Sequence, residues 1–127
     1  MTRIYPWAEL AARLALAALF IIAGAGKIPG YEGVAGYMQS MGVPGVLLPL
    51  VIALELIGGL AVAVGYRTRI AAFLLAGFSL LSALVFHNPI ADPAEQTQFL
   101  KNLAIGGGFL LLWVHGAGRL SLDARRS

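Results

Sequence analysis

The chain has 127 residues, of which 59% are hydrophobic and only 12% are charged, whereas about a quarter of the residues in a soluble domain carry charge. With a mean hydropathy of +0.82, this composition excludes an ordinary soluble domain and indicates one integral membrane domain over residues 1–127. The chain contains no cysteine, which excludes structural disulfides, thiolate metal sites and thiol redox motifs. The formal charge of +3 does not indicate nucleic-acid binding, because the basic residues are spread over the chain ends and one turn.

Four apolar runs reach or approach the roughly 20 residues that a helix needs to cross a hydrocarbon core about 30 Å thick. Segments rich in Gly and Pro, or in Arg, separate them. The alternating segments of about ten residues that a membrane β-barrel requires are absent. The sequence therefore predicts an all-α fold, a bundle of four transmembrane helices over approximately residues 7–27, 46–64, 70–86 and 99–115.

A short segment between the first two runs has its own pattern. Apolar residues recur at helical spacing from Tyr31 to Met41, which predicts a short amphipathic helix lying in the outer membrane interface. Such a helix is either a surface anchor or a lid over a ligand site.

The positive charges are unequally divided between the two predicted membrane faces. The outer face carries only Lys27 and Lys101. Because cytoplasmic segments keep the excess of Lys and Arg, we predict that both termini are cytoplasmic. The side that carries the excess contains Arg3, Arg13, Arg67, Arg69, Arg119, Arg125 and Arg126.

Glu55 lies near the middle of the second run. A carboxylate at the bilayer centre costs about 2.5 to 3.5 kcal/mol, so it must be paired, protonated or turned toward a polar cavity. Arg13 lies about 9 Å above the cytoplasmic end of the first run by helix rise, and we predict that it forms a buried ion pair with Glu55. Glu9, four residues before Arg13 on the same helix face, either joins this pair or competes for it. The pair either fixes helix register or takes part in catalysis.

Several hydrogen-bond donors fall at similar depth near the outer ends of the runs. They are Lys27, His87, Lys101 and Asn102. They could hold a carbonyl or anionic head group between apolar walls; alternatively, the two lysines extend into the lipid head groups. No metal or haem site is predicted, since His87 and His115 end on opposite sides of the membrane. Lys27 follows two glycines, but the rest of a phosphate-binding loop is missing, so no dinucleotide site is expected.

A set of residues along nearly the whole chain has the order and spacing of one family. It comprises Arg13, Phe20, Gly24, Lys27, Glu55-Leu56-Ile57-Gly58-Gly59, Gly65, Arg69, Phe99, Asn102, Leu103, Gly116, Gly118, Leu120, Ser121, Leu122 and Asp123. In these residues the chain resembles the DoxX/DoxD-like family of small four-helix membrane proteins. The resemblance implies a component of a redox system in a bacterial-type inner membrane. The family is named after a subunit of thiosulfate:quinone oxidoreductase.

The leading hypothesis is a quinone-interacting membrane subunit of an oxidoreductase. Glu55 and Arg13 would hold or relay the proton that accompanies quinone reduction. A carbonyl oxygen of the ring would be bound by Lys27, His87, Lys101 or Asn102. Electrons would come from a diffusible cofactor or a partner redox protein.

Two other functions remain open. One is a non-catalytic scaffold or assembly factor, in which small residues such as Gly58 and Gly107 recruit another membrane protein. The other is a small transporter. Exporters of that kind usually carry their membrane carboxylate in the first helix, where this chain has Arg13. The sequence does not decide whether the chain forms a homo-oligomer.

Overall fold

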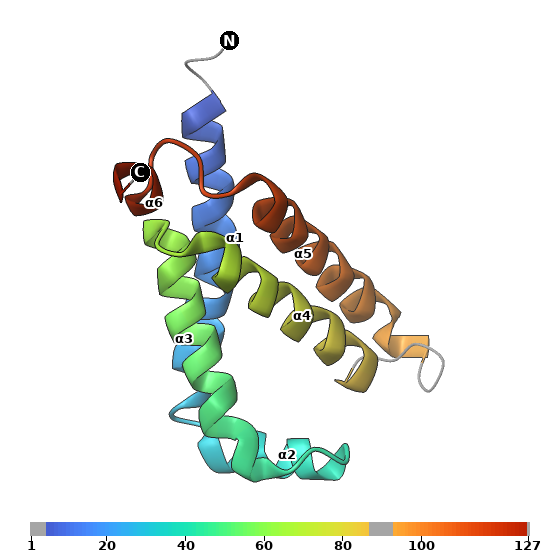
Figure 1. The fold of residues 1–127 in the computed structure, drawn as a ribbon. Helices are drawn as coiled ribbons and strands as arrows, with labels where there is room; N and C mark the ends of the chain where they lie inside the picture. The colour runs from blue at the N-terminus through green and yellow to red at the C-terminus, as the bar shows by residue number, and fades with distance from the viewer. Residues whose placement is uncertain (1–4, 87–92, 127) are drawn as a thin grey trace.

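The structure, a computed structural model, describes residues 5–86 and 93–126. Within these ranges the regular secondary structure consists of helices joined by turns and short irregular segments (Figure 1). The elements are α1 (Tyr5–Lys27), α2 (Tyr31–Ser40), the 3-10 turn η1 (Gly45–Leu47), α3 (Leu48–Val64), α4 (Thr68–Phe86), the 3-10 turn η2 (Pro93–Glu95), α5 (Gln96–His115) and α6 (Leu122–Arg126).

The predicted all-α class is confirmed, and each predicted run corresponds to one long helix. The short helix expected between the first two runs is also present, as α2. Among the described residues, three helical segments are long and apolar enough to cross a membrane: α1, Gly45–Val64 and α4. Although α5 has 20 residues, polar residues occupy its first two turns. The four-span count and the orientation therefore remain predictions.

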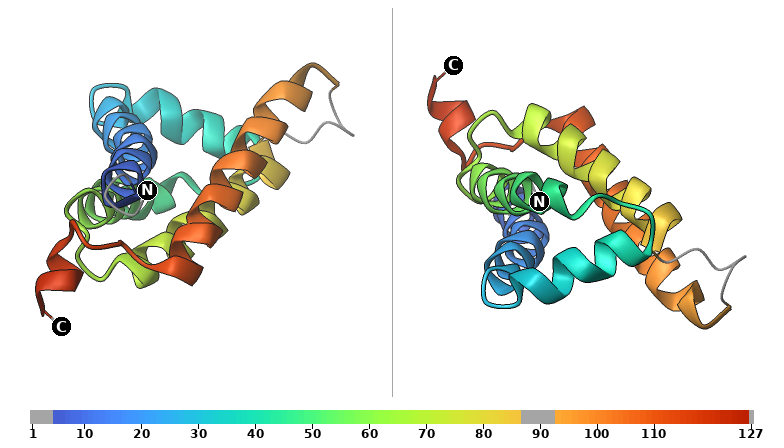
Figure 2. Two further views of the ribbon diagram at one scale, coloured as in Figure 1. Left: turned by 90° about the horizontal axis from the view of Figure 1, so that it is seen from above. Right: turned by 90° about the horizontal axis from the view of Figure 1, so that it is seen from below.

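The long helices form two antiparallel pairs. α1 packs along α3, and α4 packs along α5, while α3 and α4 join the pairs and α1 makes few contacts with α5. The pairs lie close together near the α3–α4 turn and diverge toward α2 (Figure 1). Figure 2 shows α2 extending from the α1–α3 pair toward the far ends of α4 and α5.

A layer of buried apolar side chains fills the middle of the bundle. Phe20 packs edge-to-face against Phe109, with ring centroids 5.4 Å apart, and Val62 and Leu75 are fully buried beside them. Small residues permit this close packing, as they do in other membrane helices. A Cβ on Gly58 would lie 3.3 Å from Leu75, so that glycine serves contacts within the bundle.

Arg13 closes the end of the bundle where the pairs meet. Its guanidinium donates from Nη1 to Ala117 O at 2.7 Å and from Nη2 to Leu120 O at 2.8 Å and Ala63 O at 3.2 Å. The side chain is only 2% exposed. Arg13 therefore ties α1 both to the C-terminal end of α3 and to the segment that follows α5.

That C-terminal segment also caps α4. The carboxylate of Asp123 accepts from Arg67 N at 2.7 Å and Thr68 N at 2.9 Å, which satisfies backbone donors at the helix start. The Asp123 amide donates to Gly65 O at 2.8 Å. Gly65 has a φ of +74°, a conformation that glycine adopts without strain.

Replacing Gly65 should test how closely the C-terminal segment packs against the turn between α3 and α4. A Cβ at this position would collide with Ser121, and the positive φ adds strain. Gly65→Ala is expected to lower the free energy of unfolding by about 2 kcal/mol or more, seen as a lower apparent melting temperature in detergent. Gly107→Ala is the matched control, because a Cβ there meets nothing within 4 Å. Equal melting temperatures for the two variants would contradict this close packing of Gly65 against Ser121.

Candidate functional site

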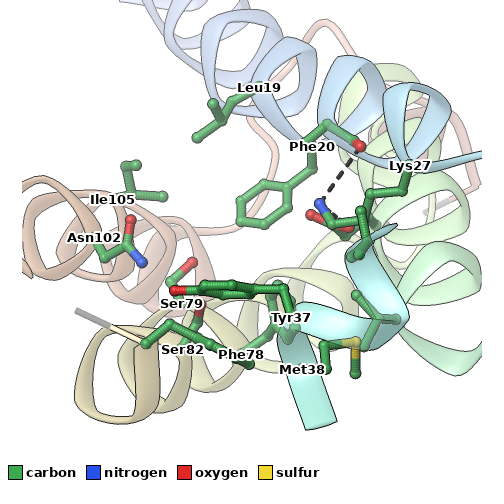
Figure 3. A pocket seen from close by; sticks show the side chains of 15 residues that line it. Leu19, Phe20, Lys27, Tyr37, Met38, Phe78, Ser79, Ser82, Asn102 and Ile105 are labelled. Carbon is green, nitrogen blue, oxygen red and sulfur yellow. Dashed lines mark hydrogen bonds and ion pairs between the residues drawn. The ribbon is translucent and has the colours of Figure 1, made fainter. Parts of the chain in front are cut away.

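A pocket of about 280 Å³ lies between the two helix pairs, on the side where they diverge (Figure 3). All five of the longer helices contribute to its lining, which is mainly apolar and aromatic. The lining residues are Leu19, Phe20, Ala23, Lys27, Val34, Tyr37, Met38, Val51, Glu55, Phe78, Ser79, Ser82, Phe86, Asn102 and Ile105. An apolar cavity with a few converging polar groups is the usual form of a small-molecule site.

One polar end of the pocket is an ion pair between α1 and α3. Lys27 Nζ lies 2.9 Å from Glu55 Oε1, and the same ammonium lies 3.4 Å from Ala23 O. The Glu55 side chain is 3% exposed, whereas that of Lys27 is 26% exposed. Lys27 therefore links the buried carboxylate to the surface at the α2 end.

The predicted ion pair between Arg13 and Glu55 is wrong. The guanidinium of Arg13 is occupied by three backbone carbonyls at the opposite end of the bundle, and Glu55 pairs with Lys27 instead. Ala63, which accepts from Arg13, lies eight residues beyond Glu55 on α3, about 12 Å along the helix axis. Arg13 therefore holds neighbouring segments of the bundle together, whereas Glu55 belongs to the pocket.

A second group of polar side chains comes from α4 and α5. Ser79 and Ser82 lie one helical turn apart on α4, and Asn102 faces the same cavity from α5. In Figure 3, Asn102 lies on the opposite side of the pocket from Lys27, and the ring of Phe20 lies between them. The pocket therefore offers polar groups at two separated ends of an aromatic space.

Helix α2 covers the pocket. Val34, Tyr37 and Met38 line it, and Met38 is buried. The Tyr37 ring stacks on Phe86 at the end of α4, with centroids 5.5 Å apart and an interplanar angle of 25°. Of the two roles considered for this helix, these contacts favour the lid over the simple surface anchor.

The remaining predicted residues are not all in the pocket. Lys101 is exposed and is not among the lining residues, and His87 lies outside the described residues. Glu9 lies near the Arg13 end, where a Cβ on Gly118 would be 2.9 Å from its carboxylate. The predicted outer cluster thus contributes Lys27 and Asn102 to the pocket.

Sequence reasoning missed Ser79, Ser82 and the participation of Tyr37 in the lining. The two serines are three residues apart in an otherwise apolar run, so they share one helix face. That spacing was the available signal for a polar site on this helix.

The chain is similar to known membrane proteins. A family model described as DoxX matches residues 8–88. "Inner membrane protein YqjF" of Escherichia coli K12 is 53% identical over 114 residues, which cover 90% of this chain and 88% of the relative. "Inner membrane protein YphA" of the same organism is 36% identical over 123 residues, covering 91% and 88%. "Putative oxidoreductase CatD" of Bacillus subtilis 168 is 32% identical over 127 residues, covering 97% and 90%. No solved structure matches the chain.

The ion pair predicts an asymmetry between its two partners. Lys27→Met leaves a buried carboxylate without its cation and is expected to lower the free energy of unfolding by about 2 kcal/mol, the cost of a buried acceptor that loses its donor. Glu55→Leu should cost less, because the freed Lys27 can extend to the interface. Apparent melting temperatures in detergent would measure both.

The double variant Lys27→Met/Glu55→Leu should recover most of the stability lost in Lys27→Met, and exposed Lys101→Met should have no effect. Strictly additive losses in the double variant would show that the two side chains are not coupled.

Proposed function

Because the chain belongs to the DoxX family of membrane proteins, we propose that it is an inner-membrane subunit of a redox system and binds a quinone ring in the pocket. The observation that carries the proposal is the placement of polar groups at two ends of one aromatic cavity, with Lys27 and Glu55 at one end and Asn102 at the other.

The chemistry of the lining suits such a ring. A quinone presents a flat apolar ring with a carbonyl at each of two opposite positions. The ammonium of Lys27 and the amide of Asn102 can each donate a hydrogen bond to a carbonyl. Phe20 and Phe78, whose rings lie edge-to-face at 6.1 Å, provide aromatic surfaces against which a ring can pack.

Glu55 is suited to move a proton. A bound quinone accepts two electrons and two protons when it is reduced. The carboxylate of Glu55 can hold one such proton within reach of the ring, and Lys27 lies 2.9 Å from it with access to the surface. Arg13 has no part in this step, because it lies at the other end of the bundle.

The arrangement of the helices also suits a lipid-borne ligand. α1 and α5 make few contacts, and Leu19 and Ile105 line the pocket from these two helices. An isoprenoid tail can leave between them toward the bilayer. The Bacillus subtilis relative is named as an oxidoreductase, which supports a redox role. Electrons would come from a partner protein.

Quinone binding can be tested on the purified chain. A short-tailed quinone is expected to raise the apparent melting temperature in detergent. Asn102→Ala should weaken binding about tenfold, the effect of one lost hydrogen bond. Gln98→Ala, an exposed amide one turn earlier on α5, is the matched control and should bind as the parent does.

Mass spectrometry after gentle purification should also find quinone bound, together with partner proteins. The absence of both co-purified quinone and any thermal response to added quinones would overturn the proposal.

We also propose that four helices span the membrane, with both termini in the cytoplasm. The arginine-rich segments and Arg13 lie at one end of the bundle, and Lys27 and α2 lie at the other, which accords with the excess of positive charge on cytoplasmic segments.

The absence of native cysteine makes this topology testable. Arg119→Cys and Glu32→Cys place single thiols at exposed positions at opposite ends of the bundle. An impermeant maleimide should label Glu32→Cys in intact spheroplasts and Arg119→Cys only after permeabilisation. The reverse pattern would overturn the orientation.

A further inference from the structure

Ser79 is a buried hydroxyl whose hydrogen bonding is incomplete. The residue is 2% exposed, and its Oγ has no hydrogen-bond partner in the part of the chain that the structure describes. A serine in a helix can bond to its own backbone one turn earlier, but Ser79 does not. Buried polar groups are normally paired, and an exception requires an explanation.

The position of Ser79 in the pocket explains why its hydroxyl has no partner within the chain. Its side chain lines the pocket, as does Ser82 one turn further along α4. Figure 3 shows Ser79 between Asn102 and Tyr37, away from Lys27. A ligand oxygen that reaches the α4 wall would complete the hydrogen bonding of Ser79.

We propose that the pocket selects a benzoquinone whose ring carries alkoxy oxygens over a naphthoquinone whose ring carries only hydrocarbon, and that Ser79 is the residue that distinguishes them. This inference rests on the proposed quinone function. The Ser79 hydroxyl donates to an alkoxy oxygen of the ring. A fused hydrocarbon ring in the same place offers the hydroxyl no acceptor, so the naphthoquinone gains no such hydrogen bond and binds more weakly than the alkoxy ring.

The experiment compares two probes with the same decyl tail, 2,3-dimethoxy-5-methyl-1,4-benzoquinone and 2-methyl-1,4-naphthoquinone, by competition binding to the purified protein. The parent chain is expected to prefer the dimethoxy ring about tenfold. Ser79→Ala should reduce this preference to about twofold or less while leaving naphthoquinone affinity unchanged.

Two further variants make the result specific. Ser79→Cys keeps the size of the side chain and weakens its donor, so it should lose the preference as well. Thr68→Val removes another buried hydroxyl without a partner in the described chain, but at the Arg13 end, so it should keep the preference.

The outcomes separate the two proposals. Equal affinity of the parent chain for both rings, or an intact preference in folded Ser79→Ala and Ser79→Cys, would overturn the role of Ser79 while leaving quinone binding in place. Failure of both rings to bind the parent chain would overturn the proposed function itself.

Discussion

The bonding of Arg13 to three backbone carbonyls is the interaction on which the remaining structure depends. A guanidinium that is 2% exposed must recover through hydrogen bonds what it loses in hydration. The carbonyls of Ala63, Ala117 and Leu120 accept from its two terminal nitrogens, whereas Nε has no partner among the described residues. Through these acceptors Arg13 joins α1, the C-terminal end of α3 and the segment after α5 at the same end of the bundle. Because both helix pairs are held together at this end, they can diverge at the other and leave a pocket without loss of the fold.

The two cations that α1 turns toward the bundle, Arg13 and Lys27, show why arginine and lysine are not equivalent here. Arg13 satisfies acceptors in several directions, which a planar guanidinium with five donor hydrogens can do. Lys27 is a compact charge on a flexible stem; it pairs with Glu55 at 2.9 Å and keeps access to the surface. The same helix therefore carries a packing residue in its first half and a pocket residue at its last position, and the nature of each cation fits its place.

The sequence predicted the helices well because their signal is local. The helical form of the apolar runs follows from the need to satisfy the backbone in lipid, and the spacing of apolar residues in α2 follows from the need to place one helix face against an apolar surface. Glu55, Lys27 and Asn102 were found because ionisable and amide groups are rare in such runs. The partner of Arg13 was predicted wrongly because its acceptors are backbone carbonyls, which have no signature in the sequence and come from positions 50 to 107 residues away. Ser79 was missed because a serine in a membrane helix is unremarkable until its neighbours are known.

Between Arg13 and Glu55 the bundle is filled by the buried layer of Phe20, Val62, Leu75 and Phe109 with several alanines, and the buried side chains of that layer have no ionisable group. Protons move along chains of polar groups or water, and the apolar side chains of this layer supply no such polar group. Glu55 is instead connected to the surface through Lys27 at the α2 end. A quinone reaction in this pocket would therefore exchange its protons through the α2 end, and it would move charge across the membrane only where the electrons arrive from the opposite face.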